Sequence, residues 1–209
     1  MPLPQSPLPQ PEFLPMTPKE LNACGITQPD IILVSGDAYV DHPSFAAALI
    51  GRALWDAGFT VGIIAQPDWR DHKFKSFTQL GEPRLFFAVV PGAVDPLVNA
   101  YTPALKKRSK DSYSPGGKLT RPERTTIVYV NALHRQYPKT PIIIGGIEAS
   151  LRRFAHYDYW SNSVRQGILA DAPASLLVYG MGELALIEIA KRMRNGDPAE
   201  RLRDIPGTC

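Results

Sequence analysis

Cysteine is scarce in this sequence. Only Cys24 and Cys209 occur among 209 residues. Two thiols cannot build a disulfide framework or a multi-cysteine metal site within the chain. We therefore expect no metal bound by this chain, and the cysteine usage fits a reducing, cytoplasmic location.

Long apolar runs are also missing. The longest stretches, such as 142–144 and 184–187, are far shorter than the roughly 20 residues that a membrane-spanning helix needs. The first residues have no basic region followed by an apolar stretch, so they do not predict a secretory signal. We expect no membrane partner.

No large excess of either charge is present, since the formal net charge is +3. Such a small value does not predict a nucleic-acid surface unless the charge is concentrated. Lysine and arginine do gather between residues 104 and 124, which we predict to be a long basic loop. The loop could contact phosphates, but such runs are usually only solvated. Tyr113 is its single aromatic residue, which argues against a stacking platform for single strands.

Proline, in contrast, is abundant, with 21 residues. Residues 1–18 are rich in proline and glutamine, a composition that favours extended conformations over packing. We predict a disordered tail over 1–18, one domain over 19–195, and a linker or truncated end over 196–209.

Short apolar runs alternate with helical periodicity from residue 30 onward. Strands are predicted at 30–35, 60–65, 84–90, 141–146 and 174–179. Helices are predicted at 19–26, 43–58, 71–80, 125–137, 149–170 and 183–193. This alternation predicts an α/β fold with a doubly wound, Rossmann-like parallel sheet. The order of the strands does not follow from their spacing.

The loops that follow the strands are polar or contain glycine. In a doubly wound sheet, ligands bind outside the carboxyl ends of the strands. Glycine lets the backbone approach a ligand closely, and amides at helix starts favour anions. Gly36 is not part of a G-x-G-x-x-G pattern, so the usual dinucleotide fingerprint is absent. The residues that we predict to bind a cofactor are Gly36, Asp37, Asp68, Trp69, Gly145, Gly146, Glu148, Gly180 and Gly182.

Asp41 and His42 follow the first strand. A histidine supported by a carboxylate could ligate a metal or cobalamin, or relay protons. Because Asp41 precedes Pro43 and Ser44, we favour the alternative that it caps the next helix.

Asp68, Trp69 and Arg70 combine a carboxylate, a stacking surface and a guanidinium. This set suits a heteroaromatic or anionic ligand, and equally a tryptophan packed on the core between paired charges. Similarly, Gly145 and Gly146 before Glu148 could approach a flat cofactor or simply form a turn between strand and helix.

The segment 151–160 is dense in cations and aromatic rings. Arginine and aromatic residues dominate interface anchors, so we favour an interface with another domain over a packed aromatic core. Five residues of this segment and three of the earlier loops are predicted to face a substrate or a second domain. They are Asp41, His42, Arg70, Arg152, Arg153, His156, Tyr157 and Trp160.

Long strings of this sequence resemble the YgiQ-type radical S-adenosylmethionine (SAM) proteins. They are residues 32–45, 62–69, 143–153, 156–160 and 177–183. The resemblance extends over nearly everything after about Lys19. It implies a Rossmann-like domain, similar to the cobalamin-binding domains of related enzymes, placed before a radical SAM barrel.

In that family the barrel carries a C-x-x-x-C-x-x-C motif, whose [4Fe-4S] cluster reductively cleaves SAM. No such cysteine triad occurs here, so the cluster and catalysis are not carried over to this chain, which resembles a truncated, split or isolated part. Residues 41–44 also lack the glycine of the D-x-H-x-x-G pattern of base-off cobalamin domains, so cobalamin ligation is not carried over.

The resemblance therefore predicts an amino-terminal domain that shapes the substrate or cofactor side of an active site. Its partners would be the radical SAM barrel and a small-molecule or RNA substrate. Two alternatives remain open. One is a free-standing module that binds cobalamin or a nucleotide, and the other is an RNA-contacting domain that uses the basic loop with Arg152 and Arg153.

Overall fold

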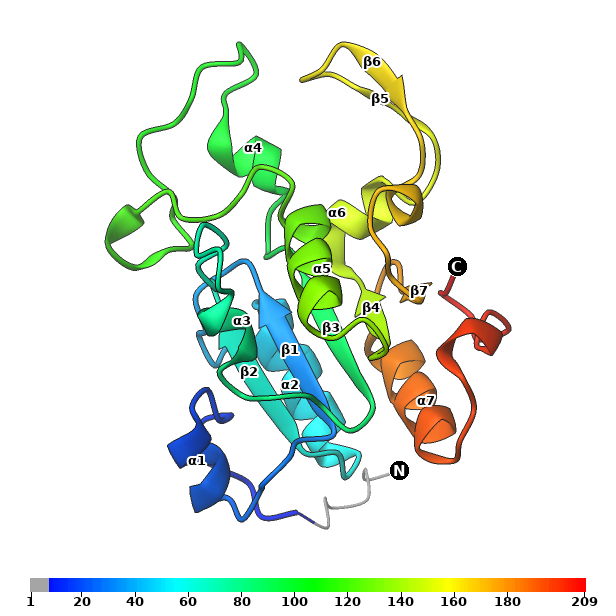
Figure 1. Ribbon diagram of the computed structural model, residues 1–209. Coiled ribbons are helices and arrows are strands. Elements are labelled where there is room, and N and C mark those ends of the chain that lie inside the picture. Colours follow the sequence, from blue (N-terminus) through cyan, green and yellow to red (C-terminus); the bar gives the residue numbers. More distant parts are fainter. Residues whose placement is uncertain (1–7) are drawn as a thin grey trace.

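The computed structural model describes residues 8–209 and contains a five-stranded parallel sheet (Figure 1). The strands are β1 (Ile31–Ser35), β2 (Val61–Ala65), β3 (Phe86–Val90), β4 (Ile142–Ile144) and β7 (Leu176–Leu177). Their order in the sheet is β2-β1-β3-β4-β7, and every pair is parallel. The predicted doubly wound α/β fold is confirmed.

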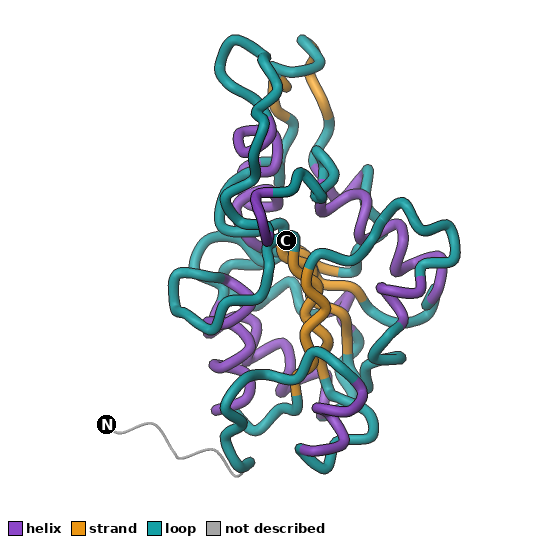
Figure 2. The backbone as a smooth tube through the Cα atoms, turned by 90° about the vertical axis from the view of Figure 1, so that its left-hand side faces the viewer, coloured by secondary structure: helices purple, strands orange, loops and turns teal. Residues whose placement is uncertain are grey.

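Helices cover both faces of this sheet (Figures 1 and 2). On one face, α2 (Ala46–Asp56) contacts α7 (Glu183–Arg194). On the other, α5 (Thr125–Gln136) contacts α3 (Lys75–Thr78) and packs on β3 and β4. Because both faces are covered, all residues of β1 and β3 are buried, which explains their uninterrupted apolar sequences.

The shorter elements lie at the ends of the sheet and in its connections. They are α1 (Pro18–Ala23), α4 (Pro96–Ala100), α6 (Gly146–Leu151), and the 3₁₀ turns η1 (Pro115–Gly117), η2 (Ile168–Ala170) and η3 (Ala199–Arg201). Within residues 8–209, each helix falls short of the length and apolar character needed to cross a membrane.

The described part of the proline-rich segment packs on the domain. Leu14 is 1% exposed. The Pro15 carbonyl accepts the Ile63 N–H at 2.8 Å, and the Trp55 indole N–H donates to the Pro9 carbonyl at 3.2 Å. Composition alone predicts a tail here, but one buried leucine and these hydrogen bonds hold residues 9–18 against the fold. Residues 1–7 of the predicted tail lie outside the described residues.

The helix predicted over 149–170 is wrong beyond Leu151. After α6 the chain forms an antiparallel hairpin of β5 (His156–Asp158) and β6 (Ser163–Arg165). Asn162 adopts a left-handed conformation (φ 48°) in the turn between them. Aromatic and β-branched residues favour strands, and asparagine tolerates this turn conformation, so local preferences support the hairpin.

The last residues also belong to the fold. Leu202 is fully buried, and the backbones of Cys209 and Leu177 exchange two hydrogen bonds of 2.8 and 2.9 Å. The sequence predicts a linker or a truncated end over 196–209, but Leu202 packs in the core and residues 207–209 pair beside β7.

Candidate functional site

The carboxyl ends of the strands meet at one edge of the molecule. The chain passes from β1 to β2 on one side, whereas β3 pairs with β1 on the other side. The strand order therefore reverses between β1 and β3, the position where open α/β sheets bind ligands. In Figures 1 and 2 the hairpin and the α4 region extend beyond this edge.

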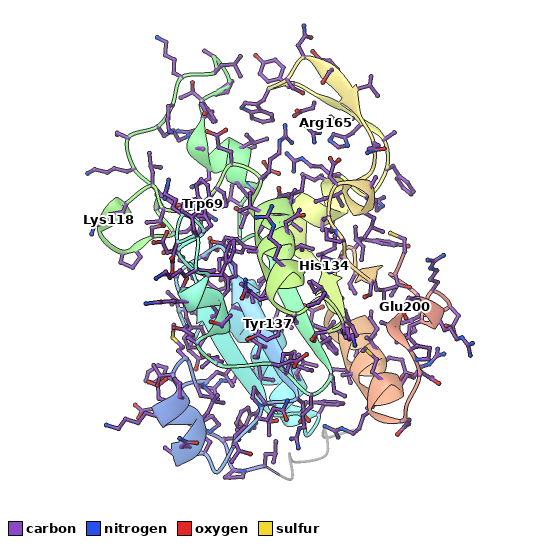
Figure 3. All side chains as sticks on the ribbon, viewed as in Figure 1. Trp69, Lys118, His134, Tyr137, Arg165 and Glu200 are labelled. Atoms are coloured by element: carbon purple, nitrogen blue, oxygen red, sulfur yellow. The ribbon has the colours of Figure 1, made fainter. Side chains whose placement is uncertain are left out.

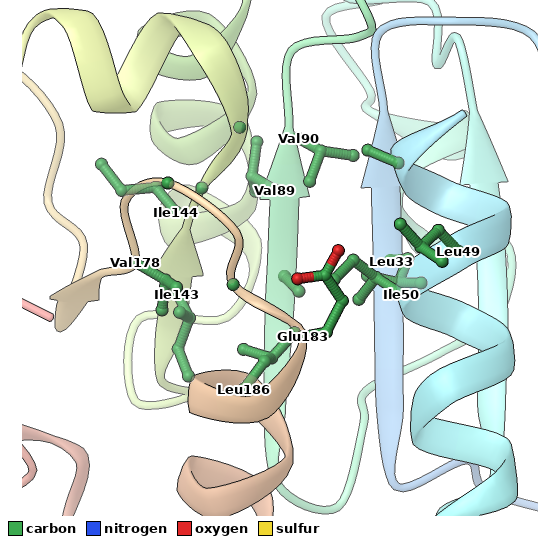
Figure 4. A pocket seen from close by; sticks show the side chains of 16 residues that line it. Leu33, Leu49, Ile50, Val89, Val90, Ile143, Ile144, Val178, Glu183 and Leu186 are labelled. Carbon is green, nitrogen blue, oxygen red and sulfur yellow. The ribbon is translucent and has the colours of Figure 1, made fainter. Parts of the chain in front are cut away.

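A cavity of about 120 Å³ lies at this edge, between the start of α7 and the flank of α2 (Figure 4). Its walls are aliphatic, and the Glu183 carboxylate projects into it. Four of the glycines that we predict to bind a cofactor line this cavity together. The lining residues are Leu33, Ala46, Leu49, Ile50, Ala88, Val89, Val90, Ile143, Ile144, Gly145, Gly146, Val178, Gly180, Gly182, Glu183 and Leu186.

Two of these glycines are required by the close approach of neighbouring segments. Gly146 has φ +79°, and a Cβ there would lie 2.9 Å from Cδ of Pro91. A Cβ at Gly182 would lie 2.7 Å from Cγ1 of Val178. The absence of side chains at Gly146 and Gly182 thus lets the loop after β4 lie against the loop after β3, and lets the loop after β7 fold back on Val178. Both bring the backbone to the cavity wall.

Gly36 and Asp37, at the end of β1, do not line this cavity. A Cβ at Gly36 would lie 2.0 Å from the Pro91 carbonyl oxygen, so the loops after β1 and β3 touch through their backbones. Asp37 is 3% exposed and accepts the Ala93 N–H at 2.6 Å. Its other oxygen accepts from Nη1 of Arg121 at 2.5 Å.

Arg121 also binds Asp111, through Nε at 3.0 Å and Nη2 at 2.9 Å. Burial raises the pKa of Asp37, although the Ala93 N–H and the Arg121 charge oppose this shift. At Asp111 burial also acts to raise the pKa, but hydrogen bonds from Tyr113 and Arg121 lower it overall. The basic loop is therefore anchored by a buried ion network, and Arg121 is not free to contact a phosphate.

Glu148 is likewise engaged within the fold. It is 1% exposed and accepts the Thr126 N–H at 2.8 Å and the Thr126 hydroxyl at 2.7 Å, near the start of α5. Burial raises its pKa to about 7, against the lowering effect of the Thr126 hydrogen bonds. Glu148 joins α6 to α5 and is not among the residues that line the cavity.

Trp69 and Arg70 line a separate hollow, whereas Asp68 does not line it and accepts the Arg70 N–H at 3.1 Å. The Arg70 guanidinium lies 4.3 Å from the Trp69 ring centroid, and the Trp69 indole donates to the Thr120 carbonyl at 2.9 Å. A hollow of about 340 Å³ beside them also includes Lys107 and Arg124. In Figure 3, Trp69 lies on one side of the carboxyl edge and Arg165, on the hairpin, lies on the other.

The interpretation of Asp41 as a helix cap is wrong. α2 begins after Phe45 without a side-chain cap, and Asp41 forms an ion pair with Arg52 instead. The Arg52 hydrogen bond lowers the pKa of Asp41. Nδ1 of His42 accepts the Ser44 N–H at 3.1 Å.

The segment 151–160 contains both buried and exposed groups. Arg152 is buried and pairs with Asp95, the N-cap of α4. This pairing weakens the RNA hypothesis, because Arg152 does not face solvent. Arg153 stacks instead, with its guanidinium 4.8 Å from the Phe154 ring centroid and 5.0 Å from that of Tyr179.

The hairpin is also tied to the region of α4 and the basic loop. Asp158 pairs with Arg124, and the Tyr159 hydroxyl donates to the Pro103 carbonyl at 2.9 Å. Trp160 lines a hollow of about 310 Å³ between the two segments. Nδ1 of His156 lies 3.0 Å from the Phe154 carbonyl oxygen.

Six apolar side chains around this edge are largely exposed, and we call them the apolar rim. Tyr157 and Val164 are opposite each other in the hairpin pairing. The contacts of Arg153 with Phe154 and Tyr179 connect the hairpin side of the rim to the loop after β7. The rim consists of Leu151, Phe154, Tyr157, Val164, Met181 and Leu184.

The iron–sulfur cluster that the resemblance implies does not fit this chain. Cys24 follows α1 at one end of the molecule, whereas Cys209 pairs with β7 (Figure 1). Among residues 8–209, no three histidine, cysteine or acidic side chains are grouped to hold a metal. No step of cluster chemistry can be assigned to residues of this chain.

Sequence reasoning missed three residues of this edge. Asp95 precedes Pro96 at the start of α4, and an Asp-Pro pair is a recognisable helix start. Glu183 follows Gly182 in the first turn of a predicted helix, where acidic residues are common. Arg121 shows no such pattern, because its partner Asp37 lies 84 positions away in the sequence.

Known proteins with similar sequences now give the family. A family model described as radical SAM N-terminal matches residues 13–209. The UPF0313 proteins of Methanosarcina acetivorans and Methanosarcina mazei are 59% and 58% identical over 97% and 92% of this chain. That of Thermotoga neapolitana is 55% identical over 93% of it. The chain spans 27%, 31% and 34% of the length of these three relatives. It therefore belongs to the radical SAM N-terminal family, as its resemblance to YgiQ-type proteins predicts.

Proposed function

We propose that this domain forms the substrate or cofactor side of a radical SAM active site, with its carboxyl edge turned toward the domain that follows in longer relatives. The following domain would supply the iron–sulfur cluster and bind SAM. The two cysteines of the present chain are free thiols, which is consistent with the cytoplasmic location that we propose.

The observation that carries this proposal is the apolar rim. Phe154 is 67% exposed, Val164 78%, Leu184 82% and Met181 90%. Soluble proteins rarely leave large contiguous apolar patches in water unless they are interaction sites. A two-stranded hairpin is also only marginally stable by itself, so packing against a second domain would stabilise β5 and β6.

Hydrogen exchange tests the proposal. Amide protection factors are compared between this chain and the full-length Methanosarcina acetivorans relative. A protection factor is used because it corrects for the effect of the local sequence on the intrinsic exchange rate. We expect residues 151–165 and 179–184 to be at least about tenfold more protected in the full-length protein. Residues 137–141, at the opposite end of the sheet, are the internal control and should not change. Equal exchange of the rim in both proteins would contradict the proposal.

A second candidate function is a free-standing ligand-binding module. It is favoured by one observation, the cavity that four predicted cofactor-binding glycines line. Titrating the chain with cobalamin, SAM and nucleotides by calorimetry tests it. Heat of binding from one of these compounds, lost in a variant whose cavity is filled, would support a module. No heat from any of them would favour the first proposal, in which this domain forms one side of a radical SAM active site.

A further inference from the structure

We infer that the cavity between α2 and α7 binds one six-membered aromatic or heteroaromatic ring, with an N–H donor of the ring directed at Glu183. This inference deepens the proposed function by naming a ligand class for the same edge. It relies on that proposal only for the statement that ligands bind there.

The size of the cavity sets the first limit. An engineered apolar protein cavity of about 150 Å³ stays dry and binds benzene. The present cavity measures about 120 Å³, so a single ring fits and a fused polycyclic system does not. The sheet forms its floor, through Leu33, Val89 and Ile143, and these side chains are fully or almost fully buried.

The chemistry of the walls sets the second limit. Apart from Glu183, the described lining residues carry only aliphatic side chains or none. Phosphates and sugars need several hydrogen-bond partners when they leave water, and the side chains of these walls offer only one, a carboxylate, which repels a phosphate. An apolar ring loses little hydration and gains dispersion contacts with leucine, isoleucine and valine.

Glu183 provides the polar contact. Its carboxylate extends from the first turn of α7 toward Leu33 and Ile50 across the cavity (Figure 4). None of the ion pairs found within residues 8–209 includes Glu183. A carboxylate is an acceptor only, so it selects a ring with an N–H donor, and a cationic ring most strongly.

The glycines leave the mouth of the cavity open. Nothing lies within 4 Å of the position that a Cβ would take at Gly180, and at Gly145 the nearest atom is the Val178 carbonyl oxygen at 3.4 Å. The edge of a ring can therefore reach backbone atoms here without meeting side chains. Substituents on the ring would leave through this side, toward the apolar rim.

The test uses two rings of nearly equal size and the 209-residue chain. Binding of 2-aminopyridine, which carries N–H donors, and of toluene, which has none, is measured by calorimetry and by protein NMR. We expect both to bind, and 2-aminopyridine to bind at least about tenfold more tightly. Glu183→Met, which has nearly the same length but no oxygen acceptor, should remove this preference, and the variant should still bind toluene. Equal affinity of the two rings for the wild type would overturn the role of Glu183.

Variants in which a larger side chain fills the cavity test whether the rings bind there. Leu186→Phe places a ring in the cavity and should abolish binding of both probes. Leu105→Phe, at a position that is 47% exposed and does not line the cavity, is the matched control and should bind normally. If circular dichroism shows that Leu186→Phe is unfolded, Ile50→Phe fills the cavity from α2 instead. Normal binding by a folded filled variant, or no binding by the wild type, would refute the inference. The proposed function is tested separately. If the apolar rim exchanges its amide hydrogens more slowly in the full-length relative, that function remains supported even when no ring binds.

Discussion

Arg121 donates a hydrogen bond from Nη1 to Oδ1 of Asp37 at 2.5 Å, although 84 positions separate the two residues. Both side chains are at most 4% exposed. This contact attaches the basic loop to the end of β1, beside the point where the strand order reverses. A residue that belongs to a basic run in the sequence thus serves as an internal brace in the fold.

Removing this brace should destabilise the domain strongly. Arg121→Ala leaves two buried carboxylates without their partner, and breaking a buried ion pair in this way costs about 3–5 kcal/mol. Urea denaturation should show this loss in the free energy of unfolding. The control is Lys118→Ala, at an exposed position of the same loop (Figure 3), which should change that energy by less than about 0.5 kcal/mol. Equal effects of the two substitutions would contradict the buried network.

A methyl group at Gly36 should be poorly tolerated. Gly36→Ala places a Cβ 2.0 Å from the Pro91 carbonyl oxygen. The Cβ is fixed by the backbone of residue 36 and the oxygen belongs to the backbone of Pro91, so neither atom can rotate away. We expect a loss of about 1–3 kcal/mol or more in thermal or urea unfolding, in the range of overpacked cores. Gly145→Ala is the matched control, because its Cβ would meet only ordinary contact at 3.4 Å. A Gly36→Ala variant as stable as Gly145→Ala would show that the loops after β1 and β3 are not in contact.

Glu148 should make stability depend on pH. Its pKa rises from 4.5 to about 7 on folding because the carboxyl group is buried. Between these values the folded state holds more protons than the unfolded state, so the free energy of unfolding falls as the pH rises. The full effect is about 3 kcal/mol, since one pKa unit corresponds to about 1.4 kcal/mol.

Urea unfolding at a series of pH values from 4 to 8 measures this effect. Glu148→Gln keeps an acceptor for Thr126 but cannot ionise, so the fall in stability over this window should become smaller by that amount. Glu188→Gln, on the exposed side of α7, should retain the wild-type slope. A Glu148→Gln variant with the wild-type slope would show that this carboxyl group does not titrate in the window.

Leu14 should contribute to stability as a core residue. Leu14→Ala creates a cavity beside Gly51 and should reduce the free energy of unfolding by about 2–5 kcal/mol. The neighbouring Phe13 is 61% exposed, so Phe13→Ala should change it by less than about 0.5 kcal/mol. The comparison is made by urea denaturation. Similar small effects of both substitutions would mean that this segment does not pack on the domain.

Much of the sheet and its helices was predictable from local patterns. The runs 30–35 and 84–90 became β1 and β3, because buried parallel strands are apolar at every position. The helical spacing after residue 43 became α2, with Ala47, Leu54 and Trp55 on its buried face. The hairpin was missed because a short aromatic run is compatible with either a helix or a strand until its turn is fixed.

The candidate site was only partly predictable. Glycine at the strand ends pointed to the edge where four of these glycines line one cavity, as the rule for doubly wound sheets leads one to expect. It did not separate Gly145, Gly146, Gly180 and Gly182, which line one cavity, from Gly36, which lies against Pro91. That difference depends on which loops are neighbours, and the order of the strands decides it.

The sequence by itself determined the fold class and the family, since both are read from the order of local patterns and strings along the chain, and it predicted a ligand edge at the carboxyl ends of the strands. Only the tertiary structure decided that Arg121 and Arg152 are internal braces, that Leu14 belongs to the core, and that Glu183 faces an apolar cavity. The physical reason is that burial and charge pairing arise between segments far apart in the chain, and no local pattern records which of them meet.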